Sequence, residues 1–501
     1  MIFNAEKKQD RLENAFERFR RNIVGYNQKF RTPYGEQHII YADWTASGRL
    51  YVPIERAMLE TFGPFVGNTH SESNVTGTTM TQAYHRANAI IKQHVNAGSD
   101  DVLLNVGFGM TAAINKLQRI LGLKVPEQFE KKIALKEKDR PIVFVTHMEH
   151  HSNHTTWHET IADVVVIKQT SEGLADLDDL RELLKKYKSR KLKIGSFSAC
   201  SNVTGIELPV HTMARIMHEV GGVCFADYAA SAPYVPNDMH PADPKEQLDG
   251  IIFSPHKFLG GPGASGVLIF NSHLYHLKSP DQPGGGTVLW TNPWGKHRFK
   301  PEIEEREDGG TPGFLQAIKA ALAVQLNEQM GMELMKRREA ELVEKVFNGL
   351  NGIPGFVILA DNIRTRLGMI SFYFEHVHYN LVVRLLNDRF GIQMRGGCSC
   401  AGTYGHYLLH MDKYASKRVT DKINHGDHSM KPGWVRMSIH PTTTDQEADF
   451  IVAALREIGV KGKEWERDYV YDSHLNEFRH KSGGESPIVE RWFKGNLFTE
   501  A

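Results

Sequence analysis

A lysine that follows a short apolar run is the residue of this sequence best placed for covalent chemistry. Lys257 ends the segment Ser254-Pro255-His256-Lys257, which follows the run GIIF at 250–253, and glycines crowd the residues after it. An amine at the end of a buried strand is desolvated enough to stay partly neutral, which is the state that a Schiff base needs. An arbitrary lysine is usually a surface residue, and the S-x-H-K-x-x-G-x-x-G setting favours the catalytic interpretation here.

Two side chains further up the chain suit contact with a positively charged aromatic ring. Asp227 ends the apolar run VCFAD at 223–227, and a buried carboxylate is costly there unless it meets a cation. A protonated pyridine nitrogen would be such a cation, and the pair would keep the ring able to accept electrons. His150 lies in VTHMEHHSNHTTWHE, and its imidazole could stack on the same ring and move protons. The structural alternative for Asp227 is an aspartate that caps the next turn.

A glycine-containing turn before a helical segment predicts an anion-binding cradle. Gly107, Gly109 and Thr111 follow the run DVLLNV at 101–106 and precede the helical segment AAINKLQRIL. Backbone N–H groups at the start of a helix, together with a threonine hydroxyl, can bind phosphate. A plain turn would share the same short G-x-G pattern, so this motif is informative only together with the others.

Histidines and cysteines also raise the alternative of a metal site. One segment carries His147, His150, His151, His154 and His158, with two pairs spaced four residues apart. Near the other end, a C-x-C-x5-H-x3-H pattern is formed by Cys398, Cys400, His406 and His410. The first group lacks H-E-x-x-H, and the second has a tighter cysteine spacing than structural zinc sites use. We therefore assign no metal ligand, although a metal-dependent hydrolase stays open as a remote alternative.

Length and composition restrict the class of protein that carries these residues. The chain has 501 residues, 41% hydrophobic and 24% charged, which suits a folded protein of two or three domains. Its 60 basic and 59 acidic residues leave a formal net charge of +1, which offers no broad attraction for nucleic acid or an anionic membrane. We also expect no membrane span and no secretory signal. With 4 cysteines in this length, a cytoplasmic location is expected.

Strands that alternate with helices must position these residues. Apolar, β-branched runs at 141–146, 163–168, 194–199, 223–227, 250–254 and 266–270 predict strands, and helical periodicity marks 177–187 and 211–220. This alternation predicts βαβ units in an α/β fold, with a mostly parallel sheet and helices on both faces. A Gly/Pro-rich loop joins the last two runs, so we expect one antiparallel strand there. In such a sheet, ligands bind at the carboxyl ends of the strands.

The remainder of the chain predicts a smaller α+β unit. A helical pattern from about Leu315 to Leu350 leads into strand-like runs at 357–360, 369–374, 392–395 and 434–439 and a helix at 381–390. At the other end, helical spacing of Leu12, Phe16, Phe19 and Ile23 predicts an opening amphipathic helix. We therefore predict a helical segment at 1–35, a large α/β domain at 36–314, a linking helix with a small domain at 315–460, and a C-terminal extension at 461–501.

Taken in chain order, these features resemble the pyridoxal-phosphate (PLP) enzymes of the class V aminotransferase family, most closely its cysteine desulfurase/selenocysteine lyase branch. The resemblance spans roughly residues 39 to 455 and rests on the motifs MEHHSN (148–153), SNVTG (201–205), FSPHK (253–257), GGGT (284–287), GTP (310–312), RGGCSCA (395–401) and VRMS (435–438). It implies the PLP-dependent transferase fold of type I, with a mostly parallel seven-stranded sheet and a smaller α+β domain.

The resemblance also implies how the cofactor is bound. Lys257 would form a Schiff base with pyridoxal 5'-phosphate, Asp227 would pair with the pyridine nitrogen, and His150 would stack on the ring. Asn202 would lie near the phenolic oxygen. The phosphate would be held by Thr111, Ser254 and His256. The family's counterpart of Thr287 reaches the phosphate of the neighbouring subunit, which implies a homodimer with shared active sites.

The reaction depends on what else the site offers. Cys400 matches the position at which desulfurases accept sulfur, and Cys398 could be a second acceptor or a redox partner. Arg436 matches the arginine that binds the α-carboxylate of the amino-acid substrate, with Arg395 as a second candidate. Ala230 departs from the pattern, because the desulfurases carry a glutamine at this position.

Removal of sulfur from L-cysteine through Cys400, with delivery to a sulfur-acceptor protein, is the leading hypothesis for the reaction. Transfer of an amino group to a keto acid is the alternative, since it needs no cysteine. A non-catalytic scaffold on the same fold is more remote.

Overall fold

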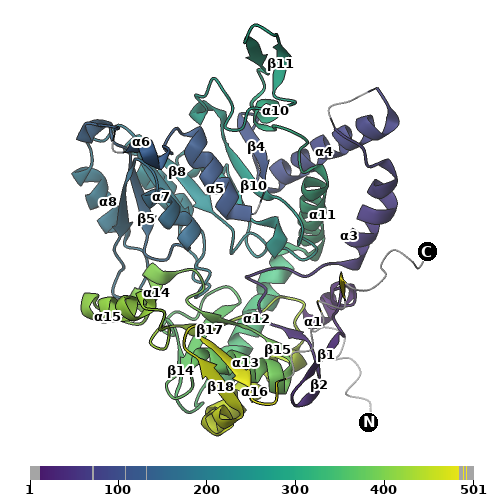
Figure 1. Cartoon of the computed structure of the whole chain (residues 1–501), viewed down its shortest axis with the longest axis vertical. Helices are drawn as coiled ribbons and strands as arrows, with labels where there is room; N and C mark the ends of the chain where they lie inside the picture. Colours follow the sequence, from purple (N-terminus) through teal and green to yellow (C-terminus); the bar gives the residue numbers. More distant parts are fainter. Residues whose placement is uncertain are drawn as a thin grey trace.

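A seven-stranded sheet forms the centre of the larger unit of the protein (Figure 1). The structure is a computed structural model that describes residues 12–69, 73–107, 109–130 and 132–483 and the single residues 489, 492 and 493. Across the sheet the strands follow the order β4 (Asp101–Val106), β10 (Gly266–Asn271), β9 (Gly250–Phe253), β8 (Val223–Asp227), β7 (Lys193–Ser198), β5 (Ile142–Thr146) and β6 (Asp163–Ile167). Only β10 runs against its neighbours β9 and β4. The prediction of a mostly parallel sheet with one antiparallel strand is confirmed.

Helices cover both faces of this sheet. Successive residues of its strands are apolar, so each strand directs apolar side chains towards both faces. Val143 and Val145 of β5 pack on one face with α5 (Gly109–Ile120), while Ile142 and Phe144 pack on the other. The second face is covered by α4 (Val75–His94), α8 (Leu177–Lys186), α9 (Val210–His218) and α11 (Phe314–Met330). Continuous burial of this kind is typical of parallel strands between two helical layers.

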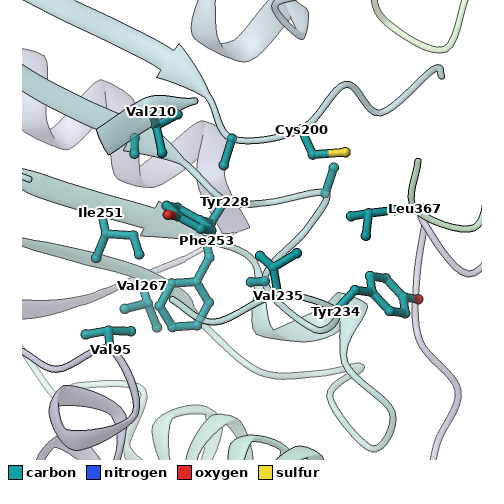
Figure 2. Packing of buried hydrophobic residues seen from close by; sticks show 14 of the residues in the cluster. Val95, Cys200, Val210, Tyr228, Tyr234, Val235, Ile251, Phe253, Val267 and Leu367 are labelled. Atoms are coloured by element: carbon teal, nitrogen blue, oxygen red, sulfur yellow. The ribbon is translucent and has the colours of Figure 1, made fainter. Parts of the chain in front are cut away.

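The core of the second face reaches the residues that follow the strands. Figure 2 shows Ile251 and Phe253 of β9 packed with Val267 of β10 and with Tyr228, which directly follows β8. The same cluster extends to Cys200, Tyr234 and Leu367. The chain segments that leave the sheet are therefore anchored by packing before they reach the carboxyl edge.

A second, smaller unit is built on an antiparallel sheet of four strands. Its order is β13 (Phe356–Ile358), β14 (Met369–Phe374), β17 (Trp434–Ser438) and β16 (Arg395–Gly397). Helices α12 (Met332–Leu350), α13 (Tyr379–Phe390) and α16 (Asp445–Trp465) pack on this sheet in one apolar cluster. The run predicted as one strand at 392–395 is divided, because β15 (Ile392–Gln393) pairs with β3 (Ile40–Tyr41) instead.

The helical pattern from Leu315 to Leu350 forms two helices rather than one. Helix α11 ends at Met330 and α12 begins at Met332, with Gly331 between them at φ +79°. A residue with a positive φ cannot continue a right-handed helix, so the chain turns at this glycine.

The ends of the chain contribute short elements to the smaller unit. The predicted opening helix is two short helices, α1 (Leu12–Ala15) and α2 (Glu17–Arg20), followed by the hairpin of β1 (Lys29–Thr32) and β2 (Gly35–His38). After α16, the hairpin of β18 (Tyr469–Asp472) and β19 (Glu477–His480) buries Tyr469 and Phe478 against the small sheet's cluster. Residues 1–11 lie outside the described part. The domain boundaries stay a prediction.

The remaining α-helices are short, and most of their residues are exposed or partly buried. They are α3 (Val52–Arg56), α6 (Glu127–Glu130), α7 (Thr155–His158), α10 (Ile303–Glu307), α14 (Gly402–Leu408) and α15 (Lys413–Asn424). A hairpin of β11 (Val288–Thr291) and β12 (His297–Phe299) projects from the larger unit at the top of Figure 1. Among the described residues, none of the helices combines the length and the apolar character that crossing a membrane requires.

Candidate active site

All of the predicted site residues except Thr287 line one cavity at the carboxyl edge of the large sheet. Strands β4 and β9 run in the same direction, because each pairs antiparallel with β10, so their carboxyl ends meet those of β5, β7 and β8. The cavity has a volume of about 190 Å³. It is lined by Thr111, His150, Asn202, Asp227, Ser254, His256, Lys257, Arg395, Cys400 and Arg436.

The backbone of the turn that carries Lys257 lies in close contact with the backbone at Gly48. It ends a single 3-10 turn after β9, and the amide of Gly48 donates a hydrogen bond to the His256 carbonyl at 2.9 Å. A side chain at position 48 would place its first carbon 1.9 Å from the Phe258 carbonyl oxygen. Burial lowers the pKa of Lys257 to about 8, although the charge of Asp227 opposes the fall. About a tenth of the amine is therefore neutral at pH 7, and about half at pH 8.

Asp227 is a buried carboxyl group at the carboxyl end of β8. Burial raises the pKa of Asp227 from 3.8 to about 7, and the hydrogen bond from the Ala229 amide, 2.8 Å to Oδ1, works against that rise. Within the described part of the chain no cation forms an ion pair with this side chain, which faces the cavity that Lys257 also lines. A carboxyl group in this state would be stabilised as an anion by a cationic ring nitrogen.

His150 begins the short segment that follows β5. Its Nδ1 accepts a hydrogen bond from the Ser152 amide at 3.1 Å. Burial and the nearby charge of Lys257 lower the pKa of His150 to about 3. The ring is therefore neutral at physiological pH, with Nε2 carrying its proton, which suits stacking on an electron-poor ring.

The start of α5 has a geometry that suits the predicted anion cradle. The Met110 amide donates to Ser254 Oγ at 2.9 Å, and Thr111 Oγ1 lies 2.6 Å from Ser152 Oγ. Gly109 has φ +68°, and a side chain there would place its first carbon 2.8 Å from Ser254 Oγ and from the His256 ring. Only glycine leaves this space free for an anion against the N-terminus of the helix. Burial lowers the pKa of His256 to about 4, so its ring is neutral as well.

Arg436 lies on β17, in the wall that the smaller unit contributes. Its Nη1 donates to the Asn202 carbonyl at 3.1 Å, and its Nη2 donates to Asp43 Oδ1 at 2.8 Å. The other carboxylate oxygen of Asp43 lies 3.4 Å from Nε of Arg395, which is half exposed. The two arginines predicted to bind a carboxylate are thus bridged by one acidic side chain, while Nε of Arg436 stays buried without a hydrogen-bond partner.

Cys400 lies in a tight turn at the rim of the cavity. The four cysteines are all unpaired; Cys400 is exposed, Cys398 is partly buried, and Cys200 and Cys224 are buried. Cys398 does not line the cavity. Asn202 contacts the turn, because its Nδ2 donates to the Ser399 carbonyl at 2.7 Å. The Oδ1 atom of Asn202 is buried without a partner.

Two acidic residues of the site were missed at the level of sequence. One is Asp43, for which the only signal is an acidic residue directly after the run IIYA. The other is Glu149, a buried carboxylate that accepts hydrogen bonds from Thr146, Asn153 and Ser198. Burial raises the pKa of Glu149, and these hydrogen bonds oppose the rise. Glu149 ties the segment that carries His150 to strands β5 and β7.

The histidines considered as metal ligands are engaged in other contacts. His147 is buried and contacts the Gly173 carbonyl at 3.2 Å through Nε2. His154 lies 3.1 Å from His158 through the two Nε2 atoms and 3.1 Å from Thr403 Oγ1 through Nδ1. Across the part of the chain that the structure describes, three or more His, Cys, Asp or Glu side chains are nowhere grouped to hold a metal ion.

Thr287 is the predicted site residue that lies apart from this cavity. It is buried in the turn before β11, and its Oγ1 donates to the Gly284 carbonyl at 2.7 Å. Its expected contact with the phosphate of a neighbouring subunit stays a prediction. Ala230, at the position of the family's glutamine, does line the cavity, together with Ser198 and Cys200.

The residues of the cavity fit pyridoxal phosphate. The cradle at Gly109 matches a phosphate, the buried acid Asp227 matches a pyridinium nitrogen, and the partly neutral amine of Lys257 matches an aldehyde. The orphaned Oδ1 of Asn202 is a further polar atom that needs a partner inside the cavity.

Comparison with known proteins agrees with this geometry. A family model described as Aminotransferase class-V matches residues 40–451. The chain is 27% identical over 371 residues to a probable cysteine desulfurase of Halalkalibacterium halodurans, covering 72% of this chain and 84% of that protein. It is also 27% identical over 372 residues to probable cysteine desulfurase 2 of Mycobacterium leprae, covering 73% and 84%.

Solved structures share the fold. A cysteine desulfurase from Thermococcus onnurineus superposes with a TM-score of 0.69 at 24% identity, covering 89% of this chain and 98% of that chain. The cysteine desulfurase CsdA from Escherichia coli gives a TM-score of 0.66 at 23% identity, covering 84% and 94%. The seven-stranded sheet and the smaller α+β unit are therefore those of the type I fold.

Proposed function

The chain belongs to the class V aminotransferase family, a family of PLP-dependent enzymes, and on this premise we propose that it is a cysteine desulfurase. In this proposal it binds pyridoxal phosphate through Lys257 and moves the sulfur of L-cysteine onto Cys400. The observation that carries the proposal is the presence of an exposed thiol in the same cavity as a partly neutral lysine and a buried guanidinium. The names of the relatives support the same activity.

Pyridoxal phosphate, when bound, supplies an electron sink for the charge that develops at the substrate's α-carbon. The protein's part is to hold that ring in place and to move protons beside it. Asp227 would stay ionised against a ring nitrogen, and the neutral ring of His150 would cover one face. Lys257 would carry the cofactor in the resting enzyme and then act as the base at the α-carbon, for which a lowered pKa is suited.

Arg436 would orient the substrate through its α-carboxylate. Its guanidinium is buried and held from two sides by the Asn202 carbonyl and by Asp43. This fixed orientation leaves Nε directed to no protein acceptor, so that atom is available for an incoming carboxylate. A planar fork that is already oriented loses little freedom when the carboxylate binds.

Cys400 would perform the sulfur transfer. Its thiolate attacks the substrate sulfur, so that a bond from Cys400 Sγ to that sulfur forms while the substrate's Cβ–S bond breaks. The electron pair of the broken bond stays with the substrate, and protonation of Cβ gives alanine. The persulfide on Cys400 stays at the rim of the cavity, where an acceptor protein can reach it.

We further propose a homodimer, and two observations support it. Thr287 is buried at the base of the β11–β12 hairpin, outside this chain's own cavity. The hairpin itself exposes large apolar side chains, with Leu289 53%, Trp290 47% and Trp294 82% exposed. Aromatic side chains of this kind are enriched at protein interfaces. A second copy of the chain would cover these side chains, and Thr287 would then lie towards the cavity of that second copy. The cytoplasmic location stays an expectation.

The proposal is tested by incubating the cofactor-loaded enzyme with L-cysteine and with a panel of other amino acids. With a thiol reductant present to release sulfide from the persulfide on Cys400, we expect the visible absorbance of the cofactor to change and alanine and sulfide to appear in equal amounts. Cys400→Ser should keep the absorbance change and lose sulfur release, whereas the control Cys224→Ser, inside β8, should retain both. If L-cysteine is inert while an amino donor and a keto acid react, the enzyme is an aminotransferase and the proposal is wrong.

A further inference from the structure

Cys400 occupies an unfavourable backbone conformation. The Ala401 amide donates to the Cys398 carbonyl at 3.0 Å, which closes a four-residue turn with Ser399 and Cys400 at its centre. Both central residues are left-handed, with φ +50° at Ser399 and +55° at Cys400. Turns with two such residues favour glycine and asparagine, because a side chain is strained there. Contacts from elsewhere in the protein must therefore stabilise this turn.

One residue supplies two of these contacts, on either side of the cysteine. The backbone amide of His151 donates to the Cys400 carbonyl at 2.7 Å. The side chain of the same residue accepts, through Nε2, a hydrogen bond from the Gly402 amide at 2.9 Å. Because Gly402 is the first residue of α14, this second bond also fixes where the turn ends and the helix begins. Burial lowers the pKa of His151, which keeps Nε2 free to accept.

Other contacts to the turn are made at Ser399. Asn202 Nδ2 donates to the Ser399 carbonyl, and Trp434 Nε1 donates to Ser399 Oγ at 3.2 Å. These bonds hold the residue before the cysteine, while His151 holds the cysteine itself and a residue after it. His151 also directly follows His150, which lines the cavity. One short stretch of chain thus sets the positions of the neutral ring and of the thiol.

We propose that His151 is a positioning residue for sulfur transfer, and that its two hydrogen bonds hold Cys400 in the left-handed turn that presents its thiol to the cavity. This inference rests on the proposed desulfurase function. It concerns only the step in which Cys400 attacks sulfur, because the His151 ring contacts Gly402, directly after the cysteine turn, and is absent from the cavity lining. Loss of the ring acceptor would leave substrate binding intact and misplace the thiol.

The test compares three variants of the cofactor-loaded, full-length enzyme. His151→Leu removes the ring acceptor, and His151→Gln keeps an acceptor of similar reach. His158→Leu is the matched control, since His158 lies on the same short segment but its ring contacts His154. Two signals are followed in a single turnover with L-cysteine: the change in cofactor absorbance, and the formation of persulfide on Cys400 by alkylation and mass spectrometry.

We expect the absorbance change in all three variants to occur within about twofold of the wild-type rate. Persulfide formation in His151→Leu, by contrast, should be slower by at least about tenfold, because a displaced nucleophile reacts poorly. His151→Gln should restore most of that rate. Persulfide formation at the wild-type rate in His151→Leu, or an equal loss in His151→Gln, would overturn the inference. If the cofactor absorbance of the wild-type enzyme does not change when L-cysteine is added, the proposed function is wrong and this inference falls with it.

A second measurement needs neither substrate nor turnover. The rate at which iodoacetamide alkylates Cys400, followed by peptide mapping, reports how the turn presents its thiol. We expect this rate to change by about threefold or more in His151→Leu and to stay at the wild-type value in His158→Leu, since only the first loosens the turn. An unchanged alkylation rate in His151→Leu would contradict the inference even if that variant bound the cofactor poorly.

Discussion

Replacing Asp227 by asparagine should make the cofactor-free protein more stable and at the same time impair the enzyme. In the folded state the pKa of Asp227 is raised from 3.8 to about 7, so between these values the folded protein binds more protons than the unfolded chain. Stability therefore falls as pH rises through that window, and the loss is complete above pH 7. At about 1.4 kcal/mol per pH unit, the stability lost through this carboxyl, relative to pH values below 3.8, is roughly 2 kcal/mol at pH 5 and roughly 4 kcal/mol at pH 8.

Asparagine has no proton to lose, and its Oδ1 can still accept the hydrogen bond from the Ala229 amide. The apparent free energy of unfolding, measured in urea on the cofactor-free protein, should therefore rise in Asp227→Asn relative to wild type, by about 2 kcal/mol more at pH 8 than at pH 5. The control Asp178→Asn, on the exposed surface of α8, should show no such pH dependence. Equal effects of Asp227→Asn at both pH values would refute the reasoning.

The same variant should lose affinity for the cofactor. An amide offers no negative charge to a ring nitrogen, so pyridoxal phosphate should bind Asp227→Asn more weakly, and the visible absorbance with L-cysteine should change more slowly. Retention of full activity would show that Asp227 does not contact the ring. The opposite signs of the two effects, on stability and on function, distinguish this prediction from simple damage to the fold.

Three further changes test other parts of the site. Arg436→Lys should raise KM for L-cysteine by about tenfold or more with a smaller effect on kcat, because lysine cannot present a planar fork to a carboxylate; steady-state kinetics would contradict this if only kcat fell. Gly109→Ala should weaken cofactor binding by about tenfold or more, since its methyl group would lie 2.8 Å from Ser254 Oγ and from the His256 ring. Titration of the cofactor-free protein with pyridoxal phosphate measures this, and unchanged affinity would place the phosphate elsewhere. Trp290→Ser combined with Trp294→Ser should shift the protein from dimer to monomer in light scattering, and an unchanged mass would remove the β11–β12 hairpin from the interface.

The sequence predicted the large sheet well, because its strands are buried on both faces and read as continuous apolar runs. The antiparallel strand after Lys257 was also expected, since no helix separates the runs at 250–254 and 266–270. The predictions of secondary structure were wrong where a strand pairs with a segment distant in the sequence, and where a helical pattern runs across a break. The run at 392–395 divides because Ile392 and Gln393 pair with Ile40 and Tyr41, and periodicity alone did not show that Gly331 ends one helix and starts another.

The site divides in the same way. Residue types at the ends of apolar runs identified Lys257, Asp227 and His150, because strand ends of a parallel sheet meet at one edge. The sequence did not identify Asp43 and Glu149 as site residues. Their roles depend on contacts with side chains that are close in space but either distant in the sequence or without a recognisable motif. In the sequence His151 is one of several clustered histidines. Its contact with Gly402, 251 residues away, exists only in the folded chain.

By itself, the sequence determined the order of strands and helices, the family and the chemical character of the reacting groups, since these depend on local pattern and on side-chain type. The tertiary structure alone decided which groups are buried together and in which state. The pKa of Asp227 and of Lys257 is set by burial, the arginines are oriented by Asp43, and the left-handed turn at Cys400 persists because distant residues hydrogen-bond to it. Solvation and geometry of this kind arise only once the two units of the fold pack against each other.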